Sequence, residues 1–225
     1  MRIKFPGSKK IKYIILMLLT FIVIGIFLKE RNENLNKAKS QNQIEKSEIK
    51  EQKIDSKKID EEKNKKFDVE YDKAYNAFFA KNYLEATNIA TSIIEIKPKY
   101  YKAYNIRGIA KAYNGDYESG MKDINKALEL KSDYGYARFN KALNYELYAH
   151  YDEALEWYNK ALKVEEYVWS YYGIASIYGR RGNVQESIKY LKKAISLDEG
   201  AKKAAKTEKD FDPVRDSKDF QDLIK

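Results

Sequence analysis

The sequence predicts an all-α protein built from helical hairpins that stack on one another. The first observation is compositional: three prolines and ten glycines in 225 residues leave little turn chemistry for an all-β fold. Lys, Glu, Ala, Leu and Ile, several of them strong helix formers, are abundant instead. The second is a pattern of small, aromatic and aliphatic residues that returns about every 34 residues from Phe67 onward. Such a period indicates a repeat array, in which each unit covers the apolar face of the next.

The amino-terminal segment predicts a transmembrane signal anchor. Residues 1–10 form a basic terminus, and residues 11–28 are almost continuously apolar from Tyr13 onward. A helix over that apolar stretch spans roughly 24 Å, slightly less than a hydrocarbon core of about 30 Å, and flanking lysines can extend it toward both interfaces. The basic flank stays in the cytoplasm by the positive-inside rule, so the chain after Leu28 is expected on the other side.

A cleaved signal peptide is the alternative to an uncleaved anchor. Such peptides end in a pair of small residues in an A-x-A arrangement, whereas this apolar region ends Gly25-Ile26-Phe27-Leu28 before a charged run. The uncleaved anchor is therefore favoured. The chain contains no cysteine, which excludes both disulfides and a lipid-modified cysteine.

Residues 29–66 form a charged connector between the anchor and the repeats. Ile44, Ile49, Ile54 and Ile59 recur every five residues, which advances about 140° around a helix, so no apolar stripe forms. A coiled coil would need a period near 3.5 residues. The segment is predicted to be either disordered or a solvated helical stalk.

Four units follow, over 67–100, 101–134, 135–167 and 168–200. Places are counted from the first residue of each unit. The eighth and twentieth places hold small residues, the seventeenth is mostly tyrosine, and the twenty-seventh and twenty-eighth are apolar. In the second unit they are Gly108, Gly120, Tyr117, Ala127 and Leu128. Each unit is predicted to be a helical hairpin whose turn lies near glycines such as Gly115 and Gly182. The small residues let paired backbones approach closely, and the larger ones fill the space between hairpins.

The last segment, 201–225, is predicted to cap the open end of the stack. Ala201, Ala204 and Ala205 give a small apolar stripe. Asp212 is placed to cap a further helix, with Pro213 at its first position. Phe220, Leu223 and Ile224 then supply a final apolar face.

The run Tyr104…Gly108…Gly115-Asp116-Tyr117…Ala127-Leu128…Leu130 resembles a tetratricopeptide repeat, and the resemblance extends over residues 67–199. It implies a right-handed α-solenoid of about four hairpins with a concave groove that binds proteins. The sequence departs from the family pattern in having the closing proline only in the first unit, at Pro98, and in placing bulky Ile93 where a small residue is usual.

The charge and residue inventory argues against several function classes. The net charge of +9 is concentrated in residues 1–66, and residues 67–225 carry only +1, which is not the basic footprint of a nucleic-acid binder. The single histidine, His150, falls in a predicted turn, and no cysteine or glycine-rich phosphate loop accompanies it. We therefore expect no enzymatic activity, no metal and no cofactor.

The resemblance implies that the first helix of each hairpin lines the groove. The aromatic and amide residues at the groove-facing places would suit an extended protein or peptide partner. The predicted binding residues are Tyr71, Tyr75, Asn105, Ile109, Tyr113, Tyr136, Phe139, Asn140, Trp169 and Tyr172. Relatives that clamp a terminal carboxylate carry Lys and Asn where this chain has Tyr71 and Tyr75, so that mode is disfavoured.

The predicted function is a single-pass membrane scaffold, with the repeats on the extracytoplasmic face of a bacterial envelope, periplasmic or at the cell surface, where they bind a protein or peptide. Two alternatives stay open. The array could be a structural module that pairs copies of the chain, or it could be a cytoplasm-facing tether. The sequence does not identify the partner or the pathway.

Overall fold

A computed structural model of the chain describes residues 66–225 together with 17, 20, 25–27 and 29–32, and the chain divides into two compact units, Met1–Asn64 and Lys65–Lys225. In the first unit the described residues are helical, and the Thr20 hydroxyl donates to the Met17 carbonyl at 2.7 Å. Within the described part of the chain, no helix is both long and apolar enough to cross a membrane. Most of the predicted anchor and connector lies outside the described residues, so both stay predictions.

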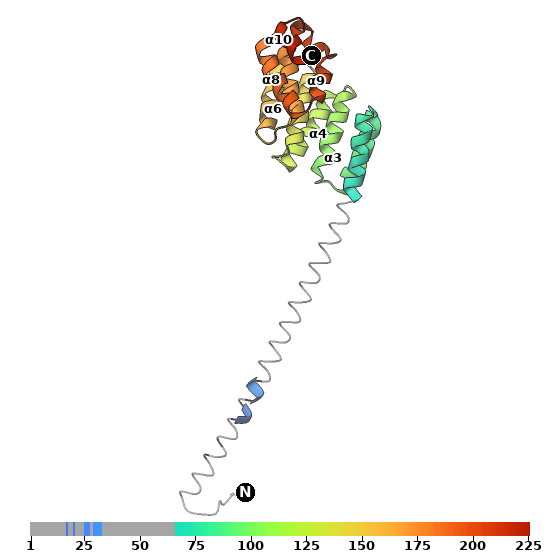
Figure 1. The fold of residues 1–225 in the computed structure, drawn as a ribbon. Helices are drawn as coiled ribbons and strands as arrows, with labels where there is room; N and C mark the ends of the chain where they lie inside the picture. The colour runs from blue at the N-terminus through green and yellow to red at the C-terminus, as the bar shows by residue number, and fades with distance from the viewer. Residues whose placement is uncertain (1–16, 18–19, 21–24, 28, 33–65) are drawn as a thin grey trace, which may run out of the picture. The chain divides into compact units, whose positions relative to one another are not determined.

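The second unit consists of antiparallel helix pairs. A helix over 66–79 is followed by α2 (Tyr83–Ile96), α3 (Tyr101–Tyr113) with α4 (Tyr117–Leu130), α5 (Gly135–Leu147) with α6 (Tyr151–Leu162), and α7 (Val168–Arg180) with α8 (Val184–Leu197). The pairs stack in chain order, and α5 contacts both α3 and α7, so the first helices of successive pairs are neighbours (Figure 1). Residues 66–225 contain no strand. The prediction of an all-α solenoid of stacked hairpins is confirmed.

The turns between paired helices share one backbone conformation. Lys81, Gly115, Ala149 and Gly182, which follow one another at intervals of 34, 34 and 33 residues, are the described residues with positive φ, at 63°, 94°, 63° and 68°. This left-handed conformation ends a helix at little cost for glycine, but it brings the Cβ of other residues too close to the backbone. Two of the four turns therefore carry a non-glycine residue at a position that favours glycine.

Lys81→Gly is expected to raise the free energy of unfolding by about 0.5 kcal/mol, because relief of the left-handed strain exceeds the extra entropy that glycine gives the unfolded chain. Lys81 is exposed, so little packing is lost. Gly115→Ala is the matched reverse change, since an added Cβ there has no atom within 4 Å and only backbone strain acts. Urea midpoints that shift in the same direction for both variants would contradict this account.

Close backbone approach holds the central hairpin together. A Cβ added at Gly108 would lie 2.8 Å from the Gly120 carbonyl oxygen, and one added at Gly120 would lie 2.7 Å from the Gly108 carbonyl oxygen. Ile124 of α4 and Ile106 of α3 are completely buried. Between hairpins, the Tyr148 hydroxyl donates to the Ala112 carbonyl at 2.9 Å. The small residues at places eight and twenty thus act as predicted, as the contact points of two helices.

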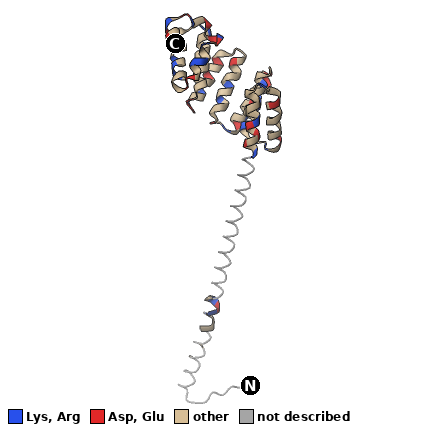
Figure 2. Cartoon of the chain, turned by 45° about the vertical axis from the view of Figure 1, so that its right-hand side comes forward, with Lys and Arg blue, Asp and Glu red and all other residues tan. Residues whose placement is uncertain are grey.

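Charged side chains of both signs are interspersed over the helices (Figure 2). One carboxylate lies in the interior: Asp123 on α4 is 7% exposed and accepts from Arg107 through both oxygens at 2.7 Å, while Lys111 contacts it at 2.7 Å. A buried carboxylate needs such partners, because its desolvation is otherwise uncompensated. The three side chains tie α3 to α4.

The carboxyl-terminal segment closes the stack but differs from prediction in one detail. It contains α9 (Gly200–Ala205), the 3₁₀ helix η1 (Lys209–Val214) and α10 (Lys218–Ile224). Pro213 lies inside η1, and α10 is instead capped by Ser217, whose hydroxyl accepts from the Phe220 backbone N–H at 3.3 Å. The prediction that Asp212 caps a helix is therefore wrong. The three-residue turn of η1 points both Phe211 and Val214 inward, where both are buried, and this explains the difference.

Candidate functional site

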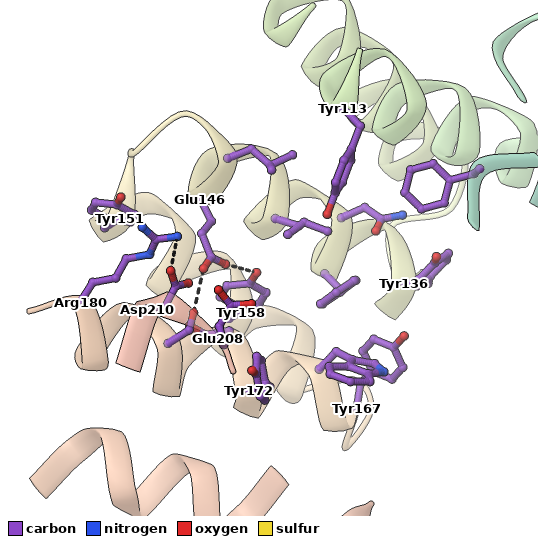
Figure 3. Close-up of a pocket in the computed structure, with 18 of the residues that line it drawn as sticks. Tyr113, Tyr136, Glu146, Tyr151, Tyr158, Tyr167, Tyr172, Arg180, Glu208 and Asp210 are labelled. Atoms are coloured by element: carbon purple, nitrogen blue, oxygen red, sulfur yellow. Dashed lines mark hydrogen bonds and ion pairs between the residues drawn. The ribbon is translucent and has the colours of Figure 1, made fainter. Parts of the chain in front are cut away.

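A cavity of about 630 Å³ lies along the first helices of the hairpins (Figure 3). The helix over 66–79, α3, α5 and α7 form most of its walls, and α6 adds Tyr151 and Tyr158. Glu208 and Asp210, at the start of η1, close one end. That volume is in the range of pockets that hold ligands. Because most of the lining comes from the first helices of four successive hairpins, the stacking of the repeats creates the cavity.

One end of the cavity is aromatic. Tyr75 and Phe79 have ring centroids 4.6 Å apart on the helix over 66–79, and Tyr136 approaches Tyr75 at 6.5 Å from α5. Phe139 stacks on Tyr136 at 6.0 Å and meets the Tyr167 ring edge to face at 4.9 Å. Rings three or four residues apart on a helix lie on one face, which is why the sequence spacing aligns them here.

Part of this aromatic surface faces solvent. Phe79 is 58% exposed and Tyr113 is 38% exposed, although both rings pack against Phe78 at 5.2 and 5.3 Å. Burial raises the pKa of Tyr113 to about 12, with a smaller contribution from Tyr83, so its hydroxyl is a neutral donor at physiological pH. Exposed rings already held in place by other rings can bury apolar area with little loss of side-chain entropy.

The other end of the cavity is polar and is built around Glu146 of α5. One Glu146 oxygen accepts from the Tyr158 hydroxyl at 2.5 Å and the other from the Ser176 hydroxyl at 2.8 Å. Beside them Arg180 contacts Asp210 at 2.6 Å. Figure 3 shows both interactions side by side at this end, with residues from α5, α6, α7 and η1 converging.

Burial dominates the electrostatics of these carboxyl groups. It raises the pKa of Glu146 above the usual range of a carboxyl group, against the hydrogen bonds from Tyr158 and Ser176, which favour the ionised form. It raises the pKa of Asp210 too, despite the neighbouring Arg180. Both carboxylates are therefore less well solvated than in water, and each would gain from a further positive charge.

The structure brings most of the predicted binding residues together. Seven line the cavity: Tyr75, Tyr113, Tyr136, Phe139, Asn140, Trp169 and Tyr172. Their role in binding stays a prediction, because the structure contains no ligand.

The other three predicted residues lie elsewhere. Asn105 and Ile109 are completely buried, since this face of α3 packs against α5, where Asn140 donates to the Asn105 amide oxygen at 3.1 Å. Tyr71 packs against Tyr100 outside the cavity lining, with ring centroids 6.3 Å apart. These three serve the contacts between hairpins.

Apart from Arg180, which the repeat register places in the groove, the polar end was missed by the sequence reasoning. Glu146 and Ser176 occupy the twelfth and ninth places of their units, which the resemblance assigns to the groove, so the repeat register alone could have found them. Asp210 lies beyond the last repeat, where no register applies. Among the described residues, no group of three or more His, Cys, Asp or Glu side chains is arranged to hold a metal ion.

Comparisons with known sequences identify the repeats. The family model described as "Tetratricopeptide repeat" matches residues 101–134 and 170–200. Tetratricopeptide repeat protein 6 of Homo sapiens is 26% identical over 125 residues, and TPR repeat-containing protein MJ1428 of Methanocaldococcus jannaschii is 26% identical over 123 residues. These matches cover 55% and 51% of this chain but only 24% and 20% of those proteins. The uncharacterized protein MJ0572 of the same archaeon is 38% identical over 69 residues, which are 31% of this chain and 76% of that protein.

Solved structures show the same fold. TTC0263, a thermophilic TPR protein of Thermus thermophilus, superposes with a TM-score of 0.55 at 17% identity, covering 59% of this chain and 74% of that one. A crystal structure of MamA superposes with a TM-score of 0.50 at 21% identity, covering 61% and 81%. At these identities the likeness concerns the fold alone.

Proposed function

Because the chain is a tetratricopeptide repeat protein, we propose that it is a membrane-anchored scaffold that binds a protein or peptide segment in the cavity along its first helices. The observation that carries the proposal is the aromatic surface of that cavity, in which large rings face solvent while other rings hold them in place. Tetratricopeptide repeats are generally scaffolds for protein interactions, and this surface is the part of the described chain best suited to that role.

The membrane part of the proposal rests on the sequence of residues 1–28. The apolar run with five basic and no acidic residues on its amino-terminal side supports a single-pass anchor, with the repeats outside the cytoplasm. In a bacterial host, an alkaline-phosphatase fusion after Lys225 is expected to be active, because that enzyme needs export. An inactive fusion, together with repeats that resist protease added to spheroplasts, would favour the cytoplasm-facing tether.

Peptide binding is tested by panning a phage-displayed library of random dodecapeptides against the full-length chain in detergent micelles. The strongest peptide is then labelled with fluorescein and titrated by anisotropy. Trp169→Ala is expected to weaken its affinity by about 30-fold, the usual effect of truncating a central aromatic anchor. Trp169 lines the cavity and packs on Tyr172, with ring centroids 5.4 Å apart.

Tyr171→Ala is the matched control on the same helix. Tyr171 lies outside the cavity and donates to Glu166 at 3.2 Å, so its removal is expected to leave affinity unchanged. Equal affinity in wild type and Trp169→Ala would remove the cavity from the binding surface. Sedimentation of the same samples tests the alternative of self-association. In that case the chain would sediment as a dimer, and panning would recover no peptide.

A further inference from the structure

We propose that the polar end of the cavity is a subsite for a basic side chain, lysine or arginine, carried by the bound peptide between apolar residues. The inference rests on the proposed function and adds the chemistry of the partner. It depends on three observations at one end of the cavity: an excess of carboxylates, a buried hydroxyl without a partner, and an adjoining apolar wall.

The charges at this end do not balance. Glu146, Glu208 and Asp210 line it, and Arg180 is the one cationic residue among those that line the cavity. Arg180 already forms an ion pair with Asp210 at 2.6 Å. The partners of Glu146 are two neutral hydroxyls, Tyr158 and Ser176, which leave further lone pairs on its oxygens. A ligand cation entering here would meet a carboxylate that no protein cation already pairs directly.

An unused donor points to a ligand independently of the carboxylates. The Tyr172 hydroxyl oxygen is completely buried and has no hydrogen-bond partner, although Tyr172 lines this cavity. Buried polar atoms in folded proteins almost always have partners. Burial is the main reason that the pKa of Tyr172 is raised, and Glu208 and Asp210 add to the effect, so the hydroxyl lies near the same carboxylates. A polar group of a ligand that displaces the atoms covering this oxygen would supply the missing partner.

The approach to the subsite is apolar. The Tyr158 ring is 1% exposed and forms part of the wall, with Leu143 and Phe139 further along the cavity. A lysine or arginine side chain has an apolar methylene stem and a charged head group. The stem would lie against the apolar wall, and the head group would reach the carboxylates. The terminal carboxylate of a peptide would instead be repelled by three carboxylates. The guanidinium of Arg180 would not offset this repulsion, because it already pairs with Asp210.

The test uses acetylated, amidated and fluorescein-labelled decapeptide libraries. One central position is fixed as Lys, Arg, norleucine or Glu, and the other positions are mixtures of Leu, Phe, Tyr, Ser and Asn. With the full-length chain, the Lys and Arg libraries are expected to bind about tenfold more tightly than the norleucine library, the usual worth of one hydrogen bond to a charged group. The Glu library is expected to bind most weakly.

Glu146→Gln keeps the shape and removes the charge, so it is expected to abolish the difference between the Lys and norleucine libraries without weakening norleucine binding. Glu208 is exposed, and Glu208→Gln keeps an amide oxygen that can still accept from the Lys209 backbone N–H. This change is expected to reduce the preference for Lys over norleucine about threefold, a typical effect of an exposed charge. Glu156→Gln is the matched control, because Glu156 pairs with Lys160 on α6 away from the cavity.

A pH series gives a second readout. Protonation of Glu146 and Asp210 removes the charge that attracts the ligand, so binding of the Lys library is expected to weaken as the pH falls, while binding of the norleucine library is not. The raised pKa values place this loss at a higher pH than for ordinary carboxyl groups. The ionisable groups that face Glu146 are Tyr113 of α3, Tyr158 of α6, Tyr172 and Arg180 of α7, and Asp210 of η1. Glu208 faces Asp210 and Tyr172.

The outcomes separate the two proposals. If all four libraries bind equally well, the basic-side-chain subsite is wrong and the proposed peptide binding stands. If no library binds, the proposed function fails and the subsite fails with it. If the chain sediments as a dimer that excludes the peptides, the occupant is a second copy of the chain, and the subsite is overturned as well.

Discussion

Gly120→Ala is expected to lower the free energy of unfolding by about 2–3 kcal/mol, because the added methyl group has no free space to occupy. The added Cβ would lie 2.7 Å from the Gly108 carbonyl oxygen, 3.1 Å from the Ala112 nitrogen and 3.2 Å from the Ala112 Cβ. Two of these atoms belong to the backbone of α3, which can move only if the helix moves. The gain in helix propensity, about 1 kcal/mol, offsets only part of the cost.

Gly135→Ala is the matched control for this packing effect. It is also a glycine-to-alanine change within a helix, but its added Cβ would first meet Glu165 Oε2 at 3.3 Å, the end of a flexible side chain. We expect a neutral or slightly stabilising change there, from helix propensity alone. Circular dichroism during urea unfolding measures both. Similar midpoints for the two variants would show that the α3–α4 approach is looser than the structure indicates.

Gly108 and Gly120 show why the packing of this fold was predictable. The same contact between paired helices recurs in every hairpin, so the same places stay small, and the repeat reveals them without a structure. The left-handed turns were only half predicted: glycine marks them at Gly115 and Gly182, whereas Lys81 and Ala149 adopt the same conformation without a sequence signal.

The candidate site was less predictable, because its residues do not recur. The register assigned Asn105 to the groove, yet its amide oxygen accepts from Asn140 in a completely buried contact between hairpins. A register gives the face of a helix, but which neighbour covers that face depends on side chains one hairpin away. Asp210 comes from a segment outside the repeats, and only the folded cap carries it to Arg180.

The second large effect is expected at Gly173 on α7, where the stacking of the hairpins and the chemistry of the cavity meet. A Cβ added there would lie 2.6 Å from Tyr158 Cε2 and 2.7 Å from its hydroxyl oxygen. Tyr158 is 1% exposed and cannot move into solvent. Gly173→Ala is therefore expected to cost about 2–3 kcal/mol of stability and to displace the ring that donates to Glu146.

Displacing that ring also changes the charge of the subsite. The Tyr158 hydrogen bond favours the ionised form of Glu146 and acts against burial, so its loss raises the pKa of Glu146 further. Gly173→Ala is thus expected to weaken binding of the Lys library as well as the fold, since less of the carboxylate is ionised at a given pH. Anisotropy titrations of the Lys and norleucine libraries, with urea unfolding of the same variant, measure both losses.

Two further variants separate the steric effect from the hydrogen bond. Tyr158→Phe removes only the hydroxyl, so it is expected to lower the preference for the Lys library as Gly173→Ala does, with a stability loss of about 1 kcal/mol. In a Tyr158→Leu background the space beside Gly173 is open, and adding Gly173→Ala is expected to cost far less than it does alone. Additive losses in that double variant would mean that Tyr158 is not what Gly173 makes room for. The glycine would then serve the packing of α7 alone, with no link to the carboxylate that the cavity presents to its ligand.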